Sequence, residues 1–378
     1  MANPLIGLEK VLGRLAEETS YLPATGGAVE DLLHPEIEER EDKFVNFEEK
    51  VFETIIETEQ TPLYRPAPPL LRSEQHLFRY FLDGSFRSYF IGTALEHERD
   101  TPVHFAQIGA AVIWRMDDGD VEVDKVEVNN LLLLAQNKLS EGVWQGLEGE
   151  VNKLGQTVKL VDISVDDQIT KHYSAEVDPR TKSVGKVTWK MHELEMKLIM
   201  SKAEACSDWL VADGSLMFEP LLSKLGALAE PRVIGVVKSF RRDPQFSFGK
   251  GQKTENFNIV KLLANLPNEH RTAAFGARSG KVAFWYVRIR EQRHLDYPLM
   301  GVVKVEMANT GEGGVDSELV DLISRAIVGE RSVTPYGLDR RWHVHLYPIH
   351  LCEEVVKNAL LSREVVRAGL RMPVIKGV

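Results

Sequence analysis

The sequence predicts an α/β protein, in which a mixed β-sheet is flanked by helices. Three apolar, strand-like runs lie between residues 77 and 115, and two more lie at 209–213 and 233–237. A long stretch with helical spacing, 186–207, stands between the two groups. Strands that alternate with helical segments are typical of a sheet covered by helices. With 378 residues, 43% of them hydrophobic, the chain can bury a large core in one domain or two.

The N-terminal part predicts helices. Leu5, Leu8, Leu12 and Leu15 recur at helical spacing over 4–20, and a second helical pattern covers 44–59. A proline-rich stretch at 62–69 then predicts a stiff linker. We therefore expect residues 1–70 to form an acidic helical extension, followed by a main domain over 71–378.

The strand-rich centre predicts three strands at 77–82, 86–95 and 103–115, joined by short turns. The polar segment 116–120 predicts a hairpin tip. Residues 128–160 have helical spacing, which predicts a helical insertion within about 116–185. Exposed leucines there would suit a homodimer.

Two carboxylates stand where apolar runs meet a Gly-Ser pair. Asp83 follows 77–82, and Asp213 follows 209–212. A charge at the end of an apolar strand is costly unless something binds it, so the pair predicts a site for a divalent cation. Glu195 lies at the edge of the buried stripe of helix 186–207, where it needs either a basic partner or a metal ion.

Other candidate residues lie further along the chain. Lys238 ends the run 233–237, and His350 stands at the start of a helix predicted over 351–370. Residues 341–347 predict a strand that places His343 and His345 on one face, as ordinary polar-face residues or as a zinc-binding pair.

Charge and cysteine content restrict the class of protein. The net charge is −10, but residues 30–59 hold twelve acidic and three basic residues, so the rest of the chain is nearly neutral. Residues 232–261 are basic, which suits phosphate binding or simply a solvated surface. The two cysteines argue against a disulfide framework and exclude a Cys-based zinc site. With no signal-peptide pattern and no long apolar run, they predict a cytoplasmic protein that does not enter a membrane.

The order of these features resembles the ribonuclease H-like arrangement, and more specifically the NurA nuclease family. The resemblance covers about residues 75–370. Its matching pieces are Asp83-Gly84-Ser85, Met191 to Glu195, Leu210–Leu216, Val233–Ser239 and Tyr347-Pro348.

The resemblance implies a manganese-dependent DNA nuclease that acts on DNA ends and single strands with 5′→3′ polarity. It also implies a ring-like homodimer and a HerA-type hexameric ATPase as partner, in DNA repair or antiphage defence. Asp83, Glu195, Asp213 and His350 would then hold two Mn²⁺ or Mg²⁺ ions, and Lys238 would contact phosphate. The basic residues expected to bind DNA are Arg241, Arg242, Lys250 and Lys253.

Two other functions fit the same residues. One is a catalytically silent ribonuclease H-like subunit that binds DNA or a motor protein as a scaffold. The other is an unrelated metal-dependent hydrolase of small phosphate esters, although the chain has no phosphate-loop spacing.

Overall fold

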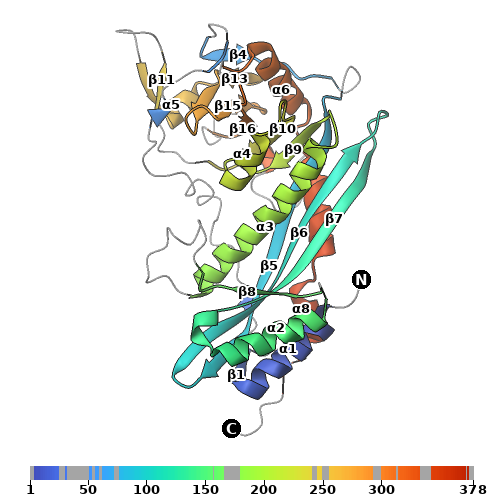
Figure 1. Ribbon diagram of the computed structural model, residues 1–378. Helices are drawn as coiled ribbons and strands as arrows, with labels where there is room; N and C mark the ends of the chain where they lie inside the picture. The colour runs from blue at the N-terminus through green and yellow to red at the C-terminus, as the bar shows by residue number, and fades with distance from the viewer. Residues whose placement is uncertain are drawn as a thin grey trace.

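Figure 1 shows a computed structural model of the protein. The residues that the structure describes are 4–24, 30–31, 51–52, 56–58, 62–71, 76–155, 157–165, 179–240, 245–248, 255–292, 299–311, 314–332, 342–371 and 373.

Three long antiparallel strands form the centre of a large mixed sheet (Figure 1). They are β5 (Phe78–Glu96), β6 (Arg99–Arg115) and β7 (Val121–Leu134). On the other side of β5 lie β9 (Trp209–Asp213) and β10 (Val233–Val237), and β5, β9 and β10 run parallel. The strand order through this part of the sheet is therefore β7-β6-β5-β9-β10.

The sheet continues beyond both ends of this group. Next to β10 come β16 (Val302–Ala308), β15 (Val282–Arg288), β13 (His270–Thr272) and β4 (Tyr64–Pro66), while β8 (Lys159–Asp162) borders β7. Three short strands pair with its members off this path: β1 (Ser20–Pro23), β2 (Glu30–Asp31) and β14 (Phe275–Ala277). A small second sheet contains β3 (Val51–Phe52), β11 (Gln245–Phe248) and β12 (Glu255–Asn258).

Helices cover both faces of the central strands. Helix α3 (Pro179–Ala203) lies along β5 and β6, and α7 (Tyr347–Ala359) packs against the same two strands from the opposite face (Figure 1). The remaining helices are α1 (Pro4–Glu18), α2 (Glu141–Lys153), α4 (Glu219–Leu225), α5 (Ile259–Ala264), α6 (Ser317–Gly329) and α8 (Arg363–Gly369), with short 3-10 turns at Gln136–Lys138 and Trp342–Val344.

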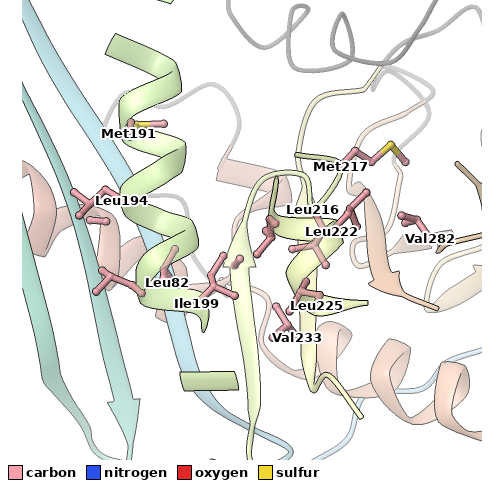
Figure 2. Close-up of a cluster of buried hydrophobic side chains, with 14 of the residues drawn as sticks. Leu82, Met191, Leu194, Ile199, Leu216, Met217, Leu222, Leu225, Val233 and Val282 are labelled. Atoms are coloured by element: carbon pink, nitrogen blue, oxygen red, sulfur yellow. The ribbon is translucent and has the colours of Figure 1, made fainter. Parts of the chain in front are cut away.

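The core is split between the two faces of the sheet. On the α3 side, Leu82 packs with Met191, Leu194 and Ile199 of the helix, and the same cluster continues to Leu216 (Figure 2). On the other side, alternate residues of the same strands pack against α6 and α7. A third cluster joins α1 and α2 to the far ends of β5–β7. This packing holds α3 and α7 on opposite sides of the part of β5 that carries Asp83.

The α/β prediction is confirmed in its coarse form, since the protein has a large mixed sheet flanked by helices. The hairpin tip at 116–120 is present, where the Met116 amide donates to the Asp120 carbonyl at 2.9 Å. The predicted helix at 186–207 corresponds to α3, and the predicted helix at 4–20 corresponds to α1.

Several predicted elements are wrong. There is no turn at Gly84, because β5 runs unbroken through it. Residues 131–134 lie in β7 rather than in a helix, and their leucines are buried, so they do not offer the exposed surface expected for a homodimer. The helix predicted over 44–59 is wrong at 51–52, which form β3, and residues 44–50 lie outside the described part of the chain.

Parts of the predicted N-terminal extension pair with the large sheet. β1 pairs with β5, and β4 pairs with β13. The division into an extension over 1–70 and a main domain over 71–378 stays a prediction. Within the described residues, no helix is both long and apolar enough to cross a bilayer.

Candidate metal centre

Asp83 lies inside β5, at its sixth residue, and not at its end. In the parallel pairing of β5 with β9, Leu82 lies opposite Ala212. The next residues are therefore Asp83 on β5 and Asp213 on β9. Residues in register on neighbouring strands project toward the same face of the sheet about 5 Å apart. The Asp83 side chain is buried, with 6% of its surface exposed. The sheet register thus places two carboxylates side by side.

Asp213 is the last residue of β9, and the chain turns away immediately after it. Gly214 has φ of +98°, a conformation that favours glycine because it has no Cβ. The loop is then fixed by Glu306 of β16, a fully buried carboxylate. Glu306 Oε2 accepts hydrogen bonds from Ser215 Oγ at 2.7 Å and from the Leu216 amide at 2.8 Å. The Gly-Ser pair of the sequence therefore serves to end the strand and anchor the loop.

Glu195 reaches the same place from α3. Its carboxylate lies directly over Gly84, so close that a Cβ on Gly84 would stand 2.7 Å from Glu195 Cδ. The absence of a side chain at Gly84 therefore makes room for Glu195 on the α3 face of β5, whereas Asp83, one residue earlier, projects toward the α7 face. The basic partner expected for Glu195 is a histidine one helical turn earlier: His192 Nδ1 lies 2.8 Å from Glu195 Oε2.

The pKa of Asp83 reflects its burial and the charges around it. The pKa of the Asp83 carboxyl is raised well above its ordinary value, first by burial, then by the negative charge of Asp213, and also by that of Glu195. Lys238 acts in the opposite direction. A raised pKa of this origin means that negative charge is crowded where little water reaches it.

Lys238 contacts one of these carboxylates, Asp213. It follows β10 directly, and its Nζ donates to Asp213 Oδ2 at 2.7 Å. Burial lowers the pKa of the Lys238 ammonium, but Asp213 and Asp83 outweigh burial and raise it. Three carboxylates with one ammonium leave a formal charge of −2, which one divalent cation would neutralise. This charge imbalance, and the oxygen-only donor set, fit Mg²⁺ or Mn²⁺.

A small hollow opens between α3 and the loop after β9. Its lining includes His192, Glu195, Asp213, Ser215 and Phe218, and its volume is about 20 Å³. That is enough for a single water molecule or ion. Glu195 and Asp213 both line the hollow, whereas Asp83 does not.

His350 is placed by α7, in its first turn. The prediction of a strand at 341–347 is wrong, because Trp342–Val344 form a 3-10 turn and α7 begins at Tyr347. His343 and His345 therefore do not share a strand face: His343 Nδ1 accepts from the Gly301 amide at 3.1 Å, whereas His345 is fully buried beside α7.

Sequence reasoning missed Glu353, and it grouped His345 with His343 instead of with His350. The ligand atoms of His345, His350 and Glu353 all lie within 4.8 Å of one another. Glu353 also adds to the negative charge that acts on Asp83 and Lys238. The His-x-x-Glu spacing on a helix signals Glu353, since residues three apart share a face.

The four basic residues predicted to bind DNA, Arg241, Arg242, Lys250 and Lys253, lie outside the described residues. Of the other predicted site residues, the structure places Asp83, Asp213 and Lys238 side by side. Glu195 lies over Gly84 on the α3 face, and the carboxylates of Asp83, Glu195 and Asp213 do not all lie within 4.8 Å of one another. It places His350 in the neighbouring cluster on α7.

No protein-family model matches this chain, and no curated protein matches it. The assignment of a function therefore depends on the site itself.

Proposed function

We propose that the protein is a metal-dependent nuclease that hydrolyses phosphodiester bonds in DNA, with Mn²⁺ or Mg²⁺ as cofactor. The observation that carries the proposal is the strand register that sets Asp83 beside Asp213, with Glu195 of α3 close enough for its charge to act on Asp83. Three buried or half-buried carboxylates would repel one another unless a cation joined them. Gathering them is costly for stability, which is typical of a functional site.

The ribonuclease H-like resemblance is supported by the order in which the elements appear. An Asp-bearing strand with two antiparallel neighbours is followed by a Glu-bearing helix and a second, parallel Asp-bearing strand. This is the arrangement that the sequence resemblance implies, and we extend it to the NurA family.

The residues have distinct roles in this proposal. Asp83, Glu195 and Asp213 hold the ions, whose chemistry is to polarise the scissile phosphate and activate water. His192 orients the Glu195 carboxylate through their 2.8 Å contact. Lys238 lies close enough to Asp213 to stabilise negative charge that develops on a phosphate oxygen bound there.

The biological setting is part of the same proposal. A HerA-type hexameric ATPase would supply DNA to the nuclease, which would act as a homodimer on DNA ends and single strands, in repair or in phage defence. These partners follow from the family resemblance.

A second function is favoured by one observation. The ion pair between Lys238 and Asp213 already neutralises one carboxylate, as a catalytically silent scaffold subunit would require. In that case the protein binds DNA or a motor partner without cleaving.

Incubation of the purified chain with end-labelled linear DNA and Mn²⁺ separates the two functions. We expect cleavage that a chelator stops and that Asp83→Asn and Asp213→Asn abolish. Glu354→Gln, an exposed carboxylate on α7, is the matched control and should cleave like wild type. DNA binding without cleavage by the wild type would overturn the nuclease and favour the scaffold.

A further inference from the structure

Strand β7 has an open edge over most of its length. β8 pairs with β7 only from Leu131 to Leu134, so within the described part of the chain Val121–Asn130 pair with β6 alone. Figure 1 shows β7 at the outer edge of the sheet, next to β6. An open edge presents backbone N–H and C=O groups that can pair with a further strand.

The side chains of this edge are sorted by face. In the pairing with β6, Val123 and Lys125 lie opposite consecutive residues, so Asp124 between them is the extra residue of a β-bulge. Val123 is 53% exposed. With Asp124 left out, the α7 face carries Val121, Val123, Val126, Val128 and Asn130, and the α3 face carries Glu122, Lys125, Glu127 and Asn129.

The open edge is symmetric about Val126. Val121–Asn130 comprise ten residues, and without Asp124 the middle one of the remaining nine is Val126. Two copies related by a two-fold axis can therefore pair antiparallel with Val126 opposite itself, along the whole open edge. The hairpin tip of each copy then comes to the point where β8 of the other copy begins.

This register is complementary on both faces. On the α7 face, Val123 lies opposite Val128 of the second copy. On the α3 face, Lys125 lies opposite Glu127 of the second copy, which gives two pairs of opposite charge in each dimer. A lysine and a bulge usually keep an edge strand from pairing with copies of itself. Here the lysine meets a glutamate instead of a second lysine, so the charges favour the pairing.

We propose that β7 pairs with β7 of a second copy of this chain, antiparallel about Val126, so that the two sheets become continuous. The homodimer within the proposed function rests on the family resemblance, and this inference gives it a surface. That surface replaces the leucines of 131–134, which are buried. The pairing does not require that the protein cleaves DNA.

Mixing of charge-reversed variants tests the register without DNA or metal. By light scattering, the wild type should have twice the 42.6 kDa mass of one chain. Lys125→Glu sets glutamate against glutamate, and Glu127→Lys sets lysine against lysine, so each variant alone should have an about tenfold higher Kd for dimerisation. An equimolar mixture restores opposite charges only between chains and should form dimers again. Glu98→Lys, in the exposed turn between β5 and β6, is the matched control and should dimerise like wild type.

Disulfide cross-linking locates the two-fold axis. Opposite residues of an antiparallel pair have Cα atoms about 4.5–5.5 Å apart, which a disulfide can span. Oxidation should therefore link Val126→Cys into dimers, but neither the wild type nor Val365→Cys, which is 47% exposed on α8.

Three results would overturn the inference: a monomeric wild type, a mixture no more dimeric than its two components, or a Val126→Cys variant that does not cross-link. Far-UV circular dichroism of each variant establishes that a loss of dimers is not a loss of folding. Absence of DNA cleavage by an intact dimer would refute the nuclease and leave this interface standing.

Discussion

Replacement of Lys238 by methionine examines the charge balance of the metal centre directly. In the folded protein Lys238 Nζ lies 2.7 Å from Asp213 Oδ2, and the two side chains are 6% and 20% exposed. With an effective dielectric constant near 20, the gross attraction at that distance is about 6 kcal/mol. Desolvation offsets part of this attraction. Removing one member of a buried pair typically costs 3–5 kcal/mol, and the exposure of Asp213 argues for the lower end, about 3 kcal/mol.

The same substitution should make stability depend on metal. Without the ammonium, Asp83, Glu195 and Asp213 carry a formal charge of −3, so Mn²⁺ should bind the variant more tightly than the wild type. At a concentration one hundred times its Kd, the ion would restore about 2.7 kcal/mol. Urea denaturation with and without Mn²⁺ measures both quantities.

A double variant provides the control. Lys238→Met combined with Asp213→Asn removes both charges and should be less destabilised than Lys238→Met alone, because no unpaired carboxylate is left at 213. A cation-binding centre at this place is refuted if Lys238→Met lowers the free energy of unfolding by less than about 1 kcal/mol. It is also refuted if Mn²⁺ stabilises the variant no more than the wild type.

Three further predictions concern other parts of the structure. Gly84→Ala must displace the Glu195 carboxylate and should weaken Mn²⁺ binding at least tenfold by calorimetry, whereas Gly149→Ala, which meets nothing within 4 Å, should not. Glu306→Gln weakens the hydrogen bonds that fix the loop after β9 and should lower the rate of DNA cleavage about 10–100-fold while the protein stays folded. An unchanged rate would show that Glu306 does not position the loop for cleavage. Burial lowers the pKa of His104 from 6.5 to about 3, so between these pH values the folded state binds fewer protons than the unfolded state. The free energy of unfolding therefore falls as the pH drops from 6.5 toward 3, by up to about 1.4 kcal/mol per pH unit. The variant His104→Phe should lose less stability over that range in urea titrations at several pH values, and an identical acid profile would contradict this.

The sequence predicted those features that depend on neighbours along the chain. The stripe of Val187, Met191, Leu194 and Leu198 predicted α3, because a helix places residues three and four apart on one face. The apolar runs before Asp213 and Lys238 predicted β9 and β10 for a similar local reason. The candidate residues Asp83, Glu195, Asp213 and Lys238 were all found in this way.

Local sequence patterns did not predict the features that depend on pairing between segments far apart in the chain. Gly84 has the appearance of a turn in the sequence, yet β5 continues through it because β6 pairs with it on both sides of that point, and Glu195 fills the space above it. The leucines of 131–134 show no period that separates strand from helix, and their pairing with β6 decides the strand.

The sequence by itself determined which residues carry charge beside apolar segments, and therefore which ones need a partner. Only the tertiary structure decided which partners they have: Asp83 next to Asp213 through the β5–β9 register, and Glu353 beside His345 through the packing of α7. The physical reason is that helix and strand periods are properties of a short segment. The meeting of two side chains over a hundred residues apart is fixed by the sheet and the core that all the segments build together.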